Sequence, residues 1–211
     1  MTRIALLAYD GVEALDFAGP FEVFTTAARV HARLHPGSEP LFEVVPVAAR
    51  PGTVTARAGL EVVPATTLGH AGRVDVVVIP GGVVDAVRRD PAVLGWIASA
   101  ARSATLTASV CTGVFLLAEA GVVVDGPVTT HWEDLADLAA EFPALQVLAE
   151  RRWVQQGRVF TSAGISAGID LSLHLVEVLA GRELAVRTAR QLDYPMPAGE
   201  SDVPGGNDPL S

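Results

Sequence analysis

Short apolar segments that alternate with helical patterns constrain this fold more than any other feature of the sequence. The apolar segments are rich in β-branched residues, and each is followed by turn-forming or small residues; they are residues 4–8, 74–79 and 104–110. Runs of this kind are typical of strands buried on both faces of a parallel sheet. Helical patterns lie between them, at residues 19–33, 83–102 (interrupted near Pro91) and 112–120. The alternation predicts an α/β fold with a doubly wound or related sheet.

The remaining segments add strands and helices to this pattern. Residues 42–47 predict a further strand, in which Pro46 indicates an edge position or a bulge. Two hairpins are predicted, at residues 50–63 and at residues 153–160, the second with its turn at Gln156–Gly157. Further helices are expected from about Ser166 to Leu179, with Gly181 as the stop, and from about Glu183 to Leu192.

No internal repeat and no long linker divides the chain. We therefore expect residues 1–194 to form a single α/β domain, a size that buries a sizeable core. Residues 195–211 contain four prolines and three glycines, a composition that predicts a loose C-terminal tail.

Composition and charge exclude several classes of function. Half of the 211 residues are hydrophobic, which favours a packed globule over a disordered chain. The chain has 24 acidic residues against 15 basic ones and a net charge of −9, so no surface for nucleic acid or for an anionic membrane is expected. All the basic residues are arginines, and the lack of lysine excludes a Schiff-base lysine and a P-loop.

The start of the chain and its cysteine content predict the cellular setting. The first apolar run ends at Asp10–Gly11, too early for a signal peptide or a membrane span, so a soluble cytoplasmic protein is expected. Cys111 is the single cysteine, which excludes an intramolecular disulfide, a cysteine-rich zinc site and a CxxC redox pair. If the chain is an enzyme, this thiol is the first candidate for its chemistry.

Cys111 occupies the point where a strand pattern changes directly into a helix pattern, in the segment Ser109–Gly113. A residue there is predicted to lie on a tight nucleophile elbow at the carboxyl edge of the sheet. The N-terminus of the following helix is expected to lower the pKa of the thiol and to favour the reactive thiolate. The alternative is a buried structural cysteine.

Two further segments predict groups that act beside the thiol. Gly81 and Gly82 end a strand and open the next helical segment, so their backbone N–H groups are candidates for an oxyanion site; the alternative is a plain tight turn. Asp16 follows the first strand between apolar residues. Partial burial there predicts a raised pKa and a role as proton donor, whereas an N-cap role is the structural alternative.

The histidines give weaker signals. His131 is a candidate base or a packed hydrogen-bond partner, and His174 is expected to pack inside an amphipathic helix. His31 and His35 lie four residues apart but have no third partner, so a metal site is not predicted. The glycine-rich segment 164–170 lacks the full dinucleotide fingerprint, and nucleotide binding is not expected.

Taken together, five motifs occur in the order seen in the ThiJ/PfpI superfamily, and the chain most resembles its isonitrile hydratase branch. The motifs are LDFAGP at 15–20, IPGG at 79–82, SVCTG at 109–113, TTHW at 129–132 and GISAGID at 164–170. The resemblance implies a flavodoxin-like three-layer α/β/α sandwich with a mostly parallel sheet, similar to class I glutamine amidotransferases. It also implies a homodimer with no metal or organic cofactor.

The resemblance assigns roles by position. Cys111 is the implied nucleophile, Asp16 the acid beside its sulfur, and Thr112 a polar contact in the place where peptidase-like members have histidine. The implied substrate-binding or oxyanion residues are Gly81, Gly82, His131, Trp132, Gly164 and Ile165. The implied reaction is hydration of an isonitrile to an N-substituted formamide through a covalent thioimidate.

Two other functions fit the same motifs. One is a non-catalytic ligand-sensing domain related to those of AraC-type regulators, although nothing after Leu192 predicts a helix-turn-helix. The other is a redox or stress protein that uses Cys111 as a peroxide-sensitive thiol. For the hydratase, a small or apolar substrate is expected if Phe17, Val83, Trp132 and Ile165 line the cavity.

Overall fold

A seven-stranded sheet forms the centre of the molecule in the computed structural model, which describes residues 1–196. The strand order is β10-β11-β7-β6-β1-β2-β5, and only the pair β10–β11 is antiparallel. The strands are β1 (Thr2–Leu7), β2 (Phe42–Ala48), β5 (Thr66–Thr67), β6 (Val76–Ile79), β7 (Leu106–Val110), β10 (Trp153–Gln156) and β11 (Val159–Ser162). The predicted α/β fold with a mostly parallel sheet is confirmed.

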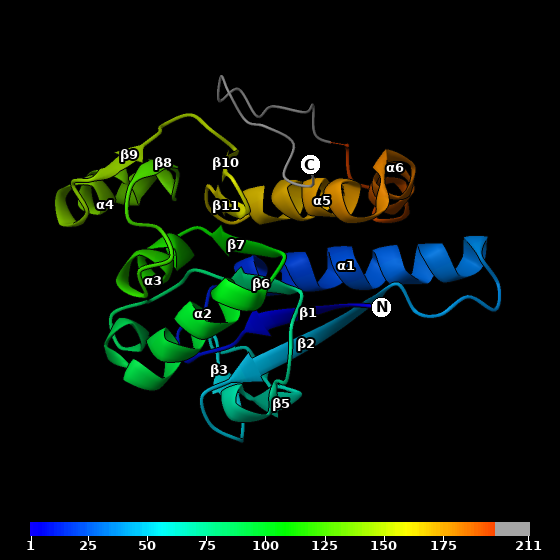
Figure 1. Cartoon of the computed structure of the whole chain (residues 1–211), viewed down its shortest axis with the longest axis horizontal. Coiled ribbons are helices and arrows are strands. Elements are labelled where there is room, and N and C mark those ends of the chain that lie inside the picture. The colour runs from blue at the N-terminus through cyan, green and yellow to red at the C-terminus, as the bar shows by residue number, and fades with distance from the viewer. Residues whose placement is uncertain (197–211) are drawn as a thin grey trace.

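Helices cover both faces of this sheet (Figure 1). On one face α1 (Ala14–Leu34) packs with α5 (Ala167–Ala180) and α6 (Arg182–Gln191). On the other face lie α2 (Pro91–Ser103) and α3 (Gly113–Glu119). The two helical layers and the sheet between them make the three-layer sandwich.

The central strands owe their position to their uninterrupted apolar sequence. Every residue of β6 and of β7 is buried, and so are the last four residues of β1. Because helices cover both faces of the sheet, both alternating sets of side chains in these strands need apolar neighbours. Because these strands run parallel, their carboxyl ends meet at one edge of the sheet, where Cys111 follows β7 and Pro80 follows β6.

Two small sheets lie outside the central one. The first is the hairpin of β3 (Val54–Thr55) and β4 (Glu61–Val62). It is joined to the segment after β1 by two hydrogen bonds, from Gly11 N to Thr55 O (2.8 Å) and from Arg57 N to Val12 O (2.9 Å). The other pairs β8 (Gly126–Val128) with β9 (Leu145–Val147), next to α4 (Leu135–Glu141). The 3-10 turns are η1 (Leu68–His70), η2 (Val87–Arg89) and η3 (Trp132–Asp134).

Several details differ from the sequence-based expectations; among them, α1 begins five residues before the predicted helix and α4 was not predicted. Residues 83–90 are not helical apart from the short turn η2, because Pro91 starts α2 with Asp90 as its N-cap. Pro46 does not lie on an edge strand, because β5 pairs with the outer side of β2. In β2 only Val47 and Ala48 pair with β5, so the missing N–H of Pro46 costs no hydrogen bond to that strand. The strands β5, β8 and β9 have two or three residues and were not predicted.

The predicted tail falls largely outside the described residues, which end at Met196. Among residues 1–196, no helix combines the length and the apolar character needed to cross a bilayer.

Candidate active site

Cys111 lies on a sharp turn between β7 and α3, in a backbone conformation that is unusual for a residue with a side chain. Its φ angle is 55°, and its side chain is buried, with 7% of the residue exposed. Non-glycine residues at positive φ cost of order 1–3 kcal/mol and persist only where surrounding contacts hold them. Here the Cys111 N–H donates to the carbonyl oxygens of Ser162 (3.1 Å) and Ala163 (3.3 Å). The predicted elbow is therefore present.

Thr130 holds the other side of this turn. It is 1% exposed, and its hydroxyl donates to the Cys111 carbonyl oxygen at 2.9 Å. Sequence reasoning singled out the motif that contains Thr130 but assigned this residue no role.

Replacing Thr130 by valine should lower the free energy of unfolding by about 1–3 kcal/mol, because a buried carbonyl loses its donor. Urea denaturation measures the change. Thr130→Ser keeps the hydroxyl, so it should recover most of the loss. A loss of stability in Thr130→Ser with none in Thr130→Val would show that the methyl group, and not the hydrogen bond, stabilises the turn.

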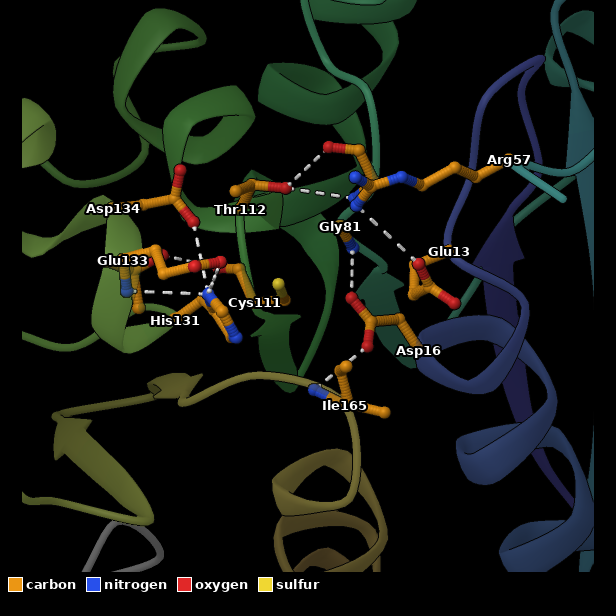
Figure 2. A network of polar contacts seen from close by, with 12 residues as sticks. Glu13, Asp16, Arg57, Gly81, Cys111, Thr112, His131, Glu133, Asp134 and Ile165 are labelled. Atoms are coloured by element: carbon orange, nitrogen blue, oxygen red, sulfur yellow. Dashed lines mark hydrogen bonds and ion pairs between the residues drawn. The ribbon is translucent and has the colours of Figure 1, made fainter.

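Asp16 lies beside the thiol, in the first turn of α1. The residue is fully buried, and its two carboxylate oxygens accept from the N–H groups of Gly81 (3.2 Å) and Ile165 (3.1 Å), as Figure 2 shows. Burial raises the pKa of Asp16 to about 6, and its interaction with the Cys111 thiol lowers that pKa in part. The raised pKa agrees with the prediction. The N-cap alternative is wrong, since Glu13 occupies that position.

The thiol itself is not the ready thiolate that the sequence predicted. Burial, followed by the negative charge of Asp16, raises the pKa of Cys111 to about 12, and the backbone N–H of Thr112 offsets only part of this. The helix after the cysteine has seven residues, and its dipole does not overcome these two effects. Deprotonation therefore needs a base, and Asp16 is the neighbouring acceptor.

The glycines of the IPGG turn act through Asp16 and Thr112 in this structure. Gly81 N–H donates to Asp16, while Gly82 N–H donates to the Thr112 hydroxyl (2.9 Å), which in turn donates to the Gly82 carbonyl oxygen (3.0 Å). The expectation that both N–H groups face a ligand is not met, because both are engaged within the protein. A Cβ atom at Gly81 would lie 2.6 Å from Thr112 N and 2.8 Å from Asp16 Oδ2, so this position needs glycine.

A cavity of about 370 Å³ opens above the thiol. Of the predicted site residues, Cys111 and Thr112 line it together with Gly82, His131 and Ile165. Gly164 and Trp132 instead line an adjacent cavity of about 470 Å³, which shares His131 and Ile165 with the first.

The cavity is more polar than expected. Four charged residues that sequence reasoning missed also line it: Glu13, Arg57, Glu133 and Asp134. Val83 and Ile165 do line the cavity, but Phe17 belongs to the core and Trp132 is 73% exposed beside the second cavity. The acidic pair directly after Trp132 was visible as a signal in the sequence, whereas Arg57 reaches the cavity only because the β3–β4 hairpin packs on the segment after β1.

The other histidines lie away from the thiol. His174 packs against Trp153 with ring centroids 4.1 Å apart, as predicted, and burial lowers its pKa. The rings of His31 and His35 lie next to each other at the end of α1, with their centroids 4.6 Å apart. Within residues 1–196, no group of three or more histidine, cysteine or acidic residues is arranged to hold a metal ion.

Comparison with known proteins places this geometry in a family. The sequence profile of the DJ-1/PfpI family matches residues 2–178. The chain is 34% identical over 204 residues to an isonitrile hydratase of Pseudomonas putida, covering 96% of this chain and 83% of that protein. It is 29% identical over 185 residues to the HTH-type transcriptional regulator CdhR of Pseudomonas aeruginosa, covering 88% of this chain and 53% of that protein.

A solved structure shows the same fold. A ThiJ/PfpI family protein from Pseudomonas syringae superposes with a TM-score of 0.80 at 29% identity, covering 97% of this chain and 79% of that one. The strained cysteine, the buried acid and these matches together assign the chain: it belongs to the DJ-1/PfpI family.

Proposed function

We propose that this chain hydrates an isonitrile, R–N≡C, to an N-substituted formamide, with Cys111 as the nucleophile and Asp16 as the group that moves protons. The observation that carries the proposal is the buried pair itself: a thiol fixed at positive φ with a carboxylate of raised pKa beside it. The 34% identity to an isonitrile hydratase across nearly the whole chain supports this reaction among those that a cysteine and an acid can catalyse.

The first half of the reaction adds the thiol across the isonitrile carbon. Asp16 accepts the thiol proton, the sulfur bonds to the terminal carbon, and Asp16 returns the proton to that same carbon. The product is a thioimidate, R–N=CH–S–Cys111, which contains every atom of the thiol and of the isonitrile. A carboxyl group with a pKa of about 6 both accepts and releases a proton near neutral pH.

The second half adds water and releases the thiol. Water bonds to the thioimidate carbon through its oxygen, and the nitrogen gains a proton, which Asp16 can relay. The C–S bond then breaks as the C=O bond forms, and the hydroxyl proton returns to the sulfur. The net change is R–N≡C plus water to R–NH–CHO, with the thiol and the carboxylate restored.

The direct test is to incubate the purified chain with a panel of small neutral, cationic and anionic isonitriles and to quantify the formamide by chromatography. Rapid quenching followed by mass spectrometry should find Cys111 heavier by the mass of one isonitrile. If no formamide forms across the panel, the hydratase proposal fails.

Asp16→Asn should lower kcat/KM for formamide formation by about 10²–10⁴-fold, because the thiol loses its proton acceptor. In the unsubstituted chain, kcat/KM should fall as pH decreases through about 6, since protonated Asp16 cannot accept the thiol proton. The asparagine variant should lack this acid limb. A pH–rate profile of both proteins measures the effect, and an unchanged acid limb in Asp16→Asn would assign the limb to another group.

A ligand-sensing domain is the second candidate. The similarity to the regulator CdhR favours it, since the chain matches about half of that protein. Binding of an isonitrile by calorimetry without turnover, in a protein whose cysteine gains no adduct, would support sensing. A role as a peroxide-sensitive redox protein has less support. Burial raises the pKa of the Cys111 thiol to about 12, so little thiolate is present to react with peroxide.

A further inference from the structure

The cavity above Cys111 has an unusual charge balance for a site expected to take an apolar substrate. Three carboxylates line it, from Glu13, Glu133 and Asp134. Among the described residues of the lining, Arg57 is the single arginine. Figure 2 shows these side chains converging from both sides on the place where the thiol lies.

The positive charges do not cancel the negative ones. Arg57 is paired with Glu13, with Nη1 and Oε2 3.9 Å apart. The other two carboxylates face His131, whose Nδ1 lies 3.5 Å from Asp134 Oδ2 and 3.7 Å from Glu133 Oε2. Even a protonated imidazole carries one charge, so at least one of these two carboxylates stays uncompensated.

This charge acts on whatever reaches the sulfur. Cys111 is more than nine-tenths buried, and the cavity is lined by the thiol residue and the carboxylates together. Glu133 lies at the exposed side, with 64% of its side chain accessible, whereas Asp134 is half as exposed, at 33%. A ligand bound in this cavity therefore shares it with both carboxylates, and their field is screened less there than at an open surface.

We propose that this cavity selects its substrate by charge: it favours isonitriles whose substituent carries a cationic group, such as an ammonium, and disfavours those that carry a carboxylate. The inference rests on the proposed hydratase function and names the substrate class for the same site. Glu133 and Asp134 are the specificity-determining residues, because Arg57 forms its ion pair with Glu13 and leaves the charges of these two carboxylates unneutralised.

The single cysteine permits a test that does not depend on turnover. Methanethiosulfonate reagents of similar size, one bearing a trimethylammonium group and one bearing a sulfonate, modify Cys111 to a mixed disulfide with release of methanesulfinate. Rates are measured at pH 8 and divided by the rates of the same reagents with a small free thiol. The cationic reagent should then react about 10-fold faster or more than the anionic one, and added salt should reduce the ratio.

Variants assign the effect to the cavity. Glu133→Gln should lower the cation-to-anion ratio by about 3-fold or more, and adding Asp134→Asn should lower it further. Glu39→Gln is the matched control, because Glu39 is an exposed residue that precedes the amino end of β2, at the opposite edge of the sheet. A ratio near one in the unsubstituted chain, or a ratio that Glu133→Gln leaves unchanged, overturns the inference.

Turnover separates this inference from the proposed function. Three isonitriles with matched chains are compared: 3-(dimethylamino)propyl isonitrile, its neutral 4-methylpentyl analogue and 4-isocyanobutanoate. We expect kcat/KM to decrease in that order. If the neutral compound is hydrated at least as well as the cationic one, charge selection is wrong and the hydratase function stands. If none is hydrated, the hydratase function fails, and the labelling ratio alone decides whether the cavity selects by charge.

Discussion

Replacing Cys111 by alanine should abolish formamide formation while leaving the fold intact. The thiol supplies the atom that bonds to the isonitrile carbon, and the residues lining the cavity include no second cysteine. Activity should fall below about 10⁻³ of that of the unsubstituted chain, and no adduct should appear by mass spectrometry. Alanine removes one sulfur atom from a buried position and leaves the backbone hydrogen bonds of the turn in place.

The loss has to be separated from unfolding. Urea denaturation of Cys111→Ala should give a free energy of unfolding within about 1–2 kcal/mol of the unsubstituted value, because only a small buried group is removed. Asp16→Asn provides the comparison, since it keeps the sulfur and loses the proton acceptor. Formamide production by folded Cys111→Ala well above about 10⁻³ of the unsubstituted rate would mean that the sulfur is not the nucleophile.

The sequence was sufficient to predict the elements that carry long apolar runs. The segments predicted at 74–79 and 104–110 contain β6 and β7, and the predicted helices at 166–179 and 183–192 correspond to α5 and α6 within one residue at each end. The two helices have enough residues for a helical period to be visible, and the two strands lie in uninterrupted, mostly apolar runs. Strands such as β5 and β9 have two or three residues, and their pairing is decided by neighbouring strands instead of by their own composition.

The candidate site could be predicted only where one local segment determines it. Cys111 and Asp16 each follow a recognisable strand, and the structure brings them together as neighbours. The pKa of the thiol could not be predicted, because its direction depends on burial and on the charge of Asp16, which lies far away in sequence. Arg57 was missed for a related reason: it enters the cavity by long-range packing of a hairpin.

Gly113→Ala should cause a large loss of stability beside the site. A Cβ atom at Gly113 would overlap the carbonyl oxygen of Ile79 and lie 3.0 Å from its carbonyl carbon and 3.1 Å from that of Pro80. These are backbone atoms of a buried strand end, so they cannot rotate away as a side chain can. We expect the free energy of unfolding, measured by urea denaturation, to decrease by about 3 kcal/mol.

The same overlap couples stability to chemistry. Relief of the clash requires the segment after β6 to move, and Gly81 in that segment donates the hydrogen bond that orients Asp16. Gly113→Ala should therefore also lower the rate of formamide formation in the protein that remains folded. Gly95→Ala is the matched control, because a Cβ atom there meets nothing within 4 Å in the exposed middle of α2. It should stabilise the chain by up to about 1 kcal/mol and leave activity unchanged. Equal stabilities for the two variants would show that the close approach of α3 to the end of β6 does not constrain the site.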